Sequence, residues 1–240
     1  MSKDSTFAQK VIAFNESLSL DTRLPKDVGV MNPFRENEFA TPISEEFYKK
    51  YYSDNNKRTY IIGINPGRFG AGVTGVPFTD TKRMESECGI EVEAMSTHEP
   101  SSVFVYEFIN AYGGPEAFYR DFYINSVSPL GFLKHKENGK SVNYNYYDSK
   151  ELEKAVEPFV KEKMEEQIDF GLHRKVALAL GSGKNYKYLK KLNEEEQYFE
   201  EIIPLEHPRY VMQYKSKNKD EYIAKFVEKL RLADRLNNEG

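Results

Sequence analysis

The chain has 240 residues, of which 39% are hydrophobic and 14% aromatic, and its formal net charge is −4. This length allows one large domain with a substantial core, and the composition is typical of a globular protein rather than a disordered one. The single cysteine, Cys88, excludes an internal disulfide framework and a cysteine-rich zinc site. The slightly acidic net charge argues against a broad basic surface that binds nucleic acid nonspecifically, but it is compatible with a local basic patch.

The first residues, MSKDSTFAQKVIAF, lack the apolar core of a signal peptide, and no apolar run of about 18 residues occurs in the sequence. We therefore expect a cytoplasmic monomer, associated with the nucleoid if the source is bacterial, that has no membrane partner. Residues 1–53 predict a helical extension packed on the rest of the domain. Its helices are expected at 7–18 and 44–52, joined by the proline-rich segment 24–34.

After this extension, apolar runs alternate with amphipathic stretches. The runs predict strands at 59–64, 122–127, 175–180 and 199–205. The other stretches predict helices at 101–111, 115–120, 149–156, 158–170, 185–195 and 219–236, the third and fourth being two helices or one kinked at Pro158. Such alternation indicates a parallel sheet covered on both faces. The sequence therefore predicts an α/β fold, a three-layer α/β/α sandwich around a four-stranded, mainly parallel sheet, in one domain over residues 1–240.

Each predicted strand ends in residues suited to ligand binding. These are Asn65, Asn125 in YINSVSPLGF, the turn at 181–183 and His207 in PLEHPRY. Because the carboxyl ends of parallel strands share one edge of a sheet, we expect the four to meet in one cleft. The first of them opens the segment IIGINPGRFGAGVTGVPF at 61–78, whose dense glycines and prolines predict a shaped loop over 67–77.

The cleft should offer amides, a histidine and an aromatic ring but no carboxylate pair, so the arrangement of most glycosidases is absent. No histidine spacing fits a zinc or iron site, and GSGK at 181–184 is too short for a P-loop, so we expect no metal and no other cofactor. An asparagine carries both a donor and an acceptor and can pair with the edge of uracil. Together with a stacking ring and a histidine that faces a developing anion, it suits a base flipped out of DNA.

The segment GINPGRFGAGVTGVPF at 63–78 resembles the first motif of the uracil-DNA glycosylase superfamily. It is most similar to the single-strand-selective monofunctional uracil-DNA glycosylases, in which this motif reads approximately GMNPGPFGMAQTGVPF. Three further stretches support the resemblance: EPSSVFVYEFINAYGGPEAFY at 99–119, NSVSPLGF beginning at Asn125, and His207-Pro208. The similarity covers roughly residues 55–215.

The resemblance implies a monofunctional DNA glycosylase that hydrolyses the N-glycosidic bond of a flipped, damaged base and initiates base excision repair. Asn65 would position the attacking water, and His207 would stabilise charge on O2 of the departing base. Phe78 would stack on the base, and Asn125 would read its Watson–Crick edge. The expected base-binding residues are Gly63, Ile64, Gly67, Arg68, Phe69, Gly70, Phe78 and Asn125. Contacts with single- or double-stranded DNA are expected from Arg68, Lys136, Ser182, Lys184, Arg209 and Tyr210.

This chain departs from the family pattern at several positions. Arg68 stands where the family usually has proline, and HPRYVMQY replaces the family's His-Pro-Ser-Pro-Arg wedge. The small residues Ala71 and Gly72 predict a larger pocket, which widens the expected bases from uracil to hydroxymethyluracil and xanthine. Two alternatives stay open: a catalytically silent module of this fold that binds damaged bases or nucleic acid, and an enzyme that acts on free nucleosides.

Overall fold

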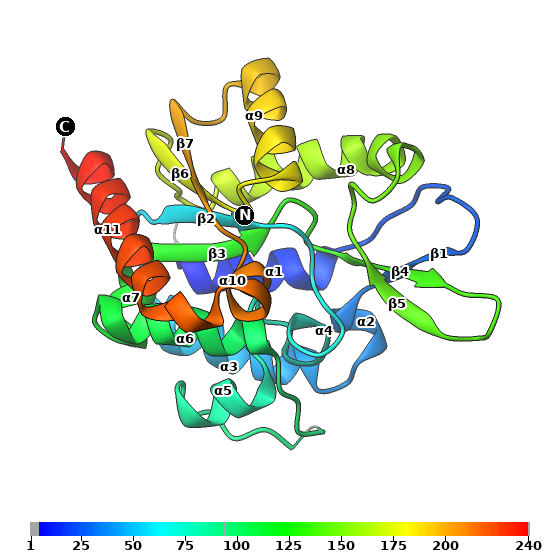
Figure 1. Cartoon of the computed structure of the whole chain (residues 1–240), viewed down its shortest axis with the longest axis horizontal. Helices are drawn as coiled ribbons and strands as arrows, with labels where there is room; N and C mark the ends of the chain where they lie inside the picture. Colours follow the sequence, from blue (N-terminus) through cyan, green and yellow to red (C-terminus); the bar gives the residue numbers. More distant parts are fainter. Residues whose placement is uncertain (1–4, 94, 240) are drawn as a thin grey trace.

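The computed structural model describes residues 5–93 and 95–239, and within them the chain forms two sheets. The larger sheet has the strand order β3-β2-β6-β7, and all of its neighbouring strands are parallel (Figure 1). Three of these strands are buried along their whole length, as expected of continuous apolar runs. The strands are β2 (Thr59–Gly63), β3 (Phe122–Ser126), β6 (Val176–Leu180) and β7 (Glu201–Leu205).

Helices cover both faces of this sheet. On one face, Phe7 of α1 packs edge-on against Tyr123 of β3, with ring centroids 5.2 Å apart. On the other face, Tyr112 of α6 packs against Phe122, with centroids 5.3 Å apart. The helices are α1 (Phe7–Ser17), α2 (Pro33–Glu36), α3 (Ala40–Tyr51), α4 (Ala71–Thr74), α5 (Thr81–Ser86), α6 (Pro100–Tyr112), α7 (Pro115–Asp121), α8 (Lys150–Ile168), α9 (Lys184–Glu196), α10 (Pro208–Tyr214), the 3₁₀ turn η1 (Ser216–Asn218) and α11 (Lys219–Asn238).

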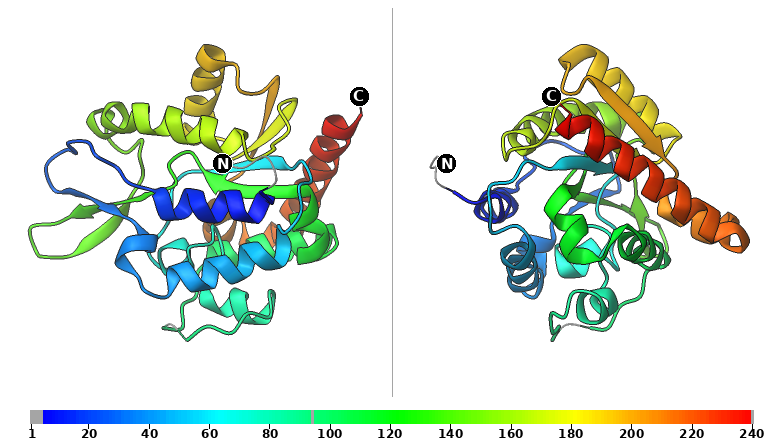
Figure 2. Two further views of the ribbon diagram at one scale, coloured as in Figure 1. Left: turned by 180° about the vertical axis from the view of Figure 1, so that it is seen from behind. Right: turned by 90° about the vertical axis from the view of Figure 1, so that its left-hand side faces the viewer.

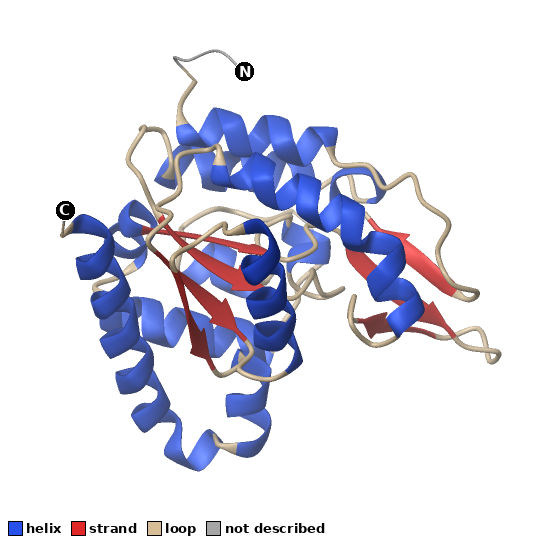
Figure 3. Cartoon of the chain, turned by 90° about the horizontal axis from the view of Figure 1, so that it is seen from above, coloured by secondary structure: helices blue, strands red, loops and turns tan. Residues whose placement is uncertain are grey.

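The smaller sheet is antiparallel and projects to one side of the molecule, away from the larger sheet (Figures 1 and 3). It consists of β1 (Val28–Met31), β4 (Gly131–His135) and β5 (Ser141–Tyr144), in the order β1-β4-β5. We call it the arm. The sequence did not predict it, because its strands are short and mostly half-buried and so lack the long apolar runs that mark the larger sheet.

The predicted α/β fold and its four-stranded parallel sheet are confirmed, and each predicted strand lies within two residues of an observed one. In the N-terminal region, α1 and α3 lie side by side (Figure 2), while the segment predicted as a proline-rich connection also contains β1. Helix α8 is one continuous helix with Pro158 inside it. The segment 67–77 is not loop throughout, since α4 forms one helical turn within it. Among the described residues, no helix is long and apolar enough to cross a bilayer.

Candidate active site

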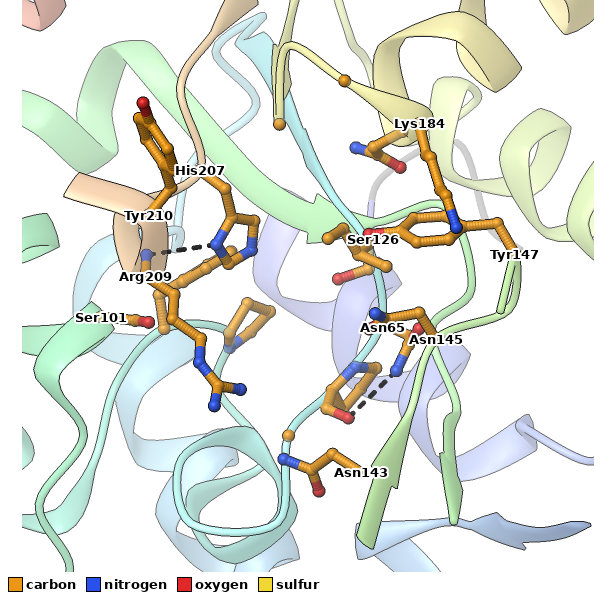
Figure 4. Close-up of a pocket in the computed structure, with 18 of the residues that line it drawn as sticks. Asn65, Ser101, Ser126, Asn143, Asn145, Tyr147, Lys184, His207, Arg209 and Tyr210 are labelled. Carbon is orange, nitrogen blue, oxygen red and sulfur yellow. Dashed lines mark hydrogen bonds between the residues drawn. The ribbon is translucent and has the colours of Figure 1, made fainter. Parts of the chain in front are cut away.

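A pocket of about 540 Å³ lies at the carboxyl edge of the parallel sheet (Figure 4). Each of the four strands brings residues to it: Asn65 follows β2, Ser126 ends β3, the turn at 181–183 follows β6, and His207 follows β7. The arm supplies Asn143 as a further wall, and the segment that follows β5 supplies Asn145 and Tyr147. The structure thus brings the ends of all four strands into one cleft.

The side-chain amide of Asn65 is held at both ends. Its Nδ2 donates to the carbonyl oxygen of Tyr144 at 3.3 Å and more weakly to that of Pro66 at 3.4 Å (Figure 4). Its Oδ1 accepts from the backbone N–H of Tyr146 at 3.1 Å. A carbonyl oxygen has two lone pairs, so Oδ1 can accept one more hydrogen bond from a molecule in the pocket. The last residue of the arm and the segment that follows it therefore orient this amide.

His207 stands on the opposite side of the pocket, immediately before α10 (Figure 4). Its Nδ1 accepts from the backbone N–H of Arg209 at 3.2 Å and caps the helix. Because Nδ1 acts as an acceptor, the ring proton lies on Nε2, which is free to donate. Burial and, secondarily, the Arg209 charge lower the pKa of His207 to about 4. The imidazole is therefore neutral at physiological pH.

Phe78 packs beside this histidine, with the ring centroids 5.9 Å apart. Its backbone has φ = 54°, a left-handed conformation that bulky residues rarely adopt and that the surrounding structure must enforce. The ring lies over Gly63: a Cβ added there would be 2.9 Å from Cε2 of Phe78. Gly63 thus belongs to the site by leaving room for Phe78 rather than by lining the pocket.

Asn125 lines a small cavity that shares Pro66, Ala71 and Pro77 with the pocket, whereas Ser126 lines the pocket itself. Successive residues of a strand point to opposite faces of the sheet. The Asn125 side chain is buried, donates to the hydroxyl of Tyr123 at 2.8 Å and accepts from the backbone of Ser126. Ser126 lines the pocket, and its Oγ lies close to Gly63. The prediction that Asn125 reads the edge of a base therefore stays a prediction, which would place that edge in the adjoining cavity.

The other predicted residues divide into two groups. Those that line the pocket are Ile64, Asn65, Gly67, Phe78, Ser182, Lys184, His207, Arg209 and Tyr210. Besides Gly63 and Asn125, those outside it are Arg68, Phe69, Gly70 and Lys136. Arg68 stacks its guanidinium on the exposed ring of Phe69 beside the pocket, and Lys136 is exposed at the end of the arm. Within the described residues, no cluster of three or more His, Cys, Asp or Glu side chains could hold a metal ion.

Sequence reasoning missed a carboxylate, Glu99, which lines the pocket just before α6. Burial and then the nearby Asp80 carboxylate raise the pKa of Glu99, while the charge of Arg209 opposes them. The carboxylate packs against the loop after β2, where a Cβ added at Gly67 would lie 3.2 Å from Oε1. This loop and Glu99 are distant in sequence, so no motif indicated that they meet.

Other missed pocket residues come from the arm and from α10. The arm residues alternate in the sequence NYNYY, which is typical of a strand, but without a predicted sheet nothing connected them to the cleft. Helix α10 adds Gln213 and Tyr214 beyond the predicted Arg209 and Tyr210. Spacing of four along a helix places Tyr214 beside Tyr210, but this helix was not predicted.

The family model for the uracil DNA glycosylase superfamily matches residues 49–231. The crystal structure of wild-type SMUG2 from Pedobacter heparinus is 51% identical to this chain, with a TM-score of 0.94, and the match covers 96% of this chain and 99% of that one. The single-strand selective monofunctional uracil-DNA glycosylases of Rattus norvegicus and Mus musculus are 27% and 25% identical over matches of 145 residues, and each match covers 53% of this chain. The chain spans about half the length of these curated relatives. It belongs to the uracil DNA glycosylase superfamily, whose members are hydrolases that act on DNA.

Proposed function

We propose that this protein is a monofunctional DNA glycosylase that hydrolyses the N-glycosidic bond of a flipped, deaminated or damaged base, with uracil as its first substrate. The observation that carries the proposal is the placement of Asn65 and a neutral His207 on opposite sides of one pocket, with Phe78 beside the histidine (Figure 4). The rat and mouse relatives are named for uracil and for single strands. A DNA substrate also agrees with the intracellular location expected from the sequence.

The proposed reaction breaks the bond between C1′ of the deoxyribose and the base nitrogen. The bonding electrons leave with the base, and the negative charge that develops on O2 accepts a hydrogen bond from Nε2–H of His207. A water that donates to Oδ1 of Asn65 adds its oxygen to C1′, and its proton passes to solvent or to the departing base. An amide cannot remove that proton, so the rate depends mainly on stabilising the leaving group.

A neutral imidazole suits this role. Protonation at Nδ1 would break the helix-capping bond from Arg209 and place a second positive charge beside its guanidinium. The site therefore keeps one ring proton and directs it from Nε2. A donor that is fixed before the reaction needs no reorganisation as the charge develops, and one such donor contributes about 3–4 kcal/mol to catalysis.

Base recognition in this proposal uses the ring of Phe78 for stacking, the amide of Asn125 for the Watson–Crick edge and the hydroxyl of Ser126 as a further polar contact. A hydroxyl can act as donor or acceptor, whereas an amide presents both in a fixed geometry. Ser126 therefore tolerates more than one base, and we include hydroxymethyluracil and xanthine with uracil among the proposed substrates. Ser182, Lys184, Arg209 and the more distant Lys136 are proposed to contact the phosphates of the strand.

The pocket also holds Lys184, the kind of residue that can form a Schiff base with the sugar. Its ammonium lies over the ring of Tyr147, 5.6 Å from the centroid. We propose that this contact keeps Lys184 at the rim for binding DNA. The prediction is that borohydride traps no covalent complex between the protein and uracil-containing DNA.

The deciding test is excision from labelled oligonucleotides that carry one deoxyuridine, hydroxymethyldeoxyuridine or deoxyxanthosine, in single and double strands, followed by alkaline cleavage at abasic sites. We expect the wild type to excise uracil, and Asn65→Ala and His207→Ala to lose the activity while still binding the DNA. Absence of cleavage from every substrate, with unchanged binding by both variants, would instead identify a silent reader of damaged bases. Release of uracil from free deoxyuridine as fast as from a strand would favour the nucleoside enzyme.

A further inference from the structure

Helix α10 presents aromatic side chains to solvent at the mouth of the pocket. Tyr210 is 42% exposed and Tyr214 is 66% exposed, and both line the pocket rim. In the described part of the chain, the other exposed large hydrophobic side chains are Phe69 and Met95. Single exposed aromatic residues are common, but two that adjoin each other and a binding pocket indicate an interaction surface.

The two tyrosines form one continuous surface. Their ring centroids are 5.6 Å apart and the ring planes are tilted by 44°. The opposite side of α10 is inaccessible, because Val211 is completely buried and Pro208 is buried as well. The helix is therefore anchored by its inner side, and the two tyrosines point outward from it.

Basic residues flank the two tyrosines in the sequence. Arg209 precedes the pair, and Lys215 and Lys217 follow it, with Arg209 and Lys217 exposed. Aromatic rings interleaved with basic groups are the arrangement that binds single-stranded nucleic acid: the rings stack on unpaired bases and the cations contact the phosphates. Stacking needs a base whose face is not already covered by a neighbour in a duplex.

We propose that Tyr210 and Tyr214 are a stacking platform for the unpaired base next to the flipped nucleotide. This inference rests on the proposed function, because the pocket must hold that nucleotide. Since the platform forms part of the pocket rim, the strand that delivers a base to Phe78 passes directly over it. The platform would contact a base on one side of the damage only, since α10 borders the pocket on one side (Figure 4).

The first test measures binding of the full-length protein to a fluorescein-labelled single-stranded oligonucleotide with one deoxyuridine, by anisotropy. Stacking on one base predicts a dissociation constant about tenfold higher for Tyr214→Ala and for the double variant with Tyr210→Ala. The matched controls Tyr214→Phe and Tyr210→Phe keep the rings and should bind like the wild type. In excision assays the alanine variants should raise KM and leave kcat nearly unchanged. Weaker binding by the phenylalanine variants would mean that the hydroxyls matter, and it would overturn the stacking role.

The second test removes the partner base instead of the ring. An abasic spacer replaces the nucleotide on the 5′ or the 3′ side of the deoxyuridine. The wild type should lose about tenfold in affinity for one of the two oligonucleotides, and the double alanine variant should lose nothing further on that same oligonucleotide. If the affinity losses caused by the spacer and by the alanine substitutions multiply, the rings and the base do not interact. Anisotropy does not require turnover, so a wild type that binds as described but excises nothing would refute the proposed function and leave the platform standing.

Discussion

The two ends of the parallel sheet are built for different purposes. At the amino edge, the Arg58 side chain is completely buried before β2. It pairs with both carboxylate oxygens of Asp54 and donates to the carbonyl of Tyr119 at 2.8 Å. Its guanidinium carbon lies 4.8 and 4.6 Å from the ring centroids of Phe7 and Tyr52. At the carboxyl edge, the same strands open into a pocket of about 540 Å³.

The difference shows how one sheet serves stability and ligand binding without conflict. Around Arg58 the polar groups are satisfied within the protein by ion pairs and hydrogen bonds. Polar groups at the carboxyl edge, such as Nε2 of His207, keep hydrogen-bonding capacity for a molecule that enters. Substitutions at the two edges should therefore affect different measurements.

The largest effect is expected at the amino edge. Arg58→Met removes a buried cation and leaves the carbonyl groups around it without donors, among them those of Tyr119 and Asn56. Each acceptor left without its donor typically costs about 1–3 kcal/mol, so these two carbonyls together cost about 2–6 kcal/mol of unfolding free energy, while the Asp54 carboxylate, whose side chain is 38% exposed, is left partly in contact with water. Urea denaturation should report this loss, while kcat for uracil excision, measured well below the melting temperature, stays near that of the wild type. A large fall in kcat of the folded variant would contradict the separation of the two edges.

The converse experiment replaces Asn65 by alanine at the carboxyl edge. If its amide holds the attacking water, kcat should fall by about 10²–10³-fold, the cost typical of losing one preorganised polar group in an active site. The loss of stability should be limited to about 1–3 kcal/mol, because the bonds lost are those from Asn65 to Tyr144 and Tyr146 and the weaker one to Pro66. Single-turnover excision and urea denaturation of the same preparation measure both quantities. If kcat of the folded variant stays near that of the wild type and only the free energy of unfolding falls, Asn65 serves to hold the neighbouring segment in place and does not act in the reaction.

The sequence predicted those strands that are buried on both faces and missed those that are half-exposed. The strands β2, β3 and β6 have few polar positions, because helices cover both faces, so their apolar runs were visible in the sequence. The arm strands are half-exposed and only four or five residues long, so their pattern is too short to distinguish from loop. The short helix α10 follows His207-Pro208 without an apolar run of its own, and it too went unpredicted.

The sequence predicted those pocket residues that directly follow the end of a strand. It did not predict those whose place in the pocket depends on the direction of a side chain. Asn65 and His207 follow strand ends, so the parallel sheet alone brings them together. Asn125 and Ser126 are adjacent, and the alternation of the strand places Ser126 in the pocket and Asn125 in the small cavity beside it. Glu99 reaches the pocket through packing against a loop, which no local pattern records.

The low pKa of His207 predicts a smaller effect, in which a residue of the pocket changes the free energy of unfolding as the pH changes. Its pKa is about 4 in the folded protein and about 6.5 in the unfolded chain. Because the folded value is the lower one, the unfolded chain binds the additional proton. The contribution of His207 to stability is therefore complete above pH 6.5 and is lost as the pH falls from there towards 4, by up to about 3 kcal/mol.

This pH effect is measured as a difference between two proteins. The free energy of unfolding of the wild type and of His207→Gln is measured by urea denaturation between pH 7.5 and 4. Carboxylates titrate in both proteins, so their contribution cancels in the difference. The wild type should lose more stability than the variant across this range. Parallel curves would indicate that His207 titrates normally in the folded protein, and the neutral-donor role would then lack support.

The smallest expected effect tests how the strand β2 supports the pocket. In Gly63→Ala, the new Cβ would lie 2.9 Å from Cε2 of Phe78 and 3.2 Å from Oγ of Ser126, so the Phe78 ring must move. Since that ring is proposed to stack on the base, KM for uracil-containing DNA should rise by about tenfold, which corresponds to about 1.4 kcal/mol.

A double-mutant cycle decides whether the ring transmits this effect. Phe78→Leu removes the aromatic face and should itself raise KM. In that background the smaller, flexible leucine can yield to the new Cβ, so Gly63→Ala should add little more. If the two changes instead multiply, the alanine acts through Ser126 or through the strand itself. The cycle thus separates a pocket shaped by the Phe78 ring from one shaped by the sheet edge, since both contacts start from the same missing side chain at Gly63.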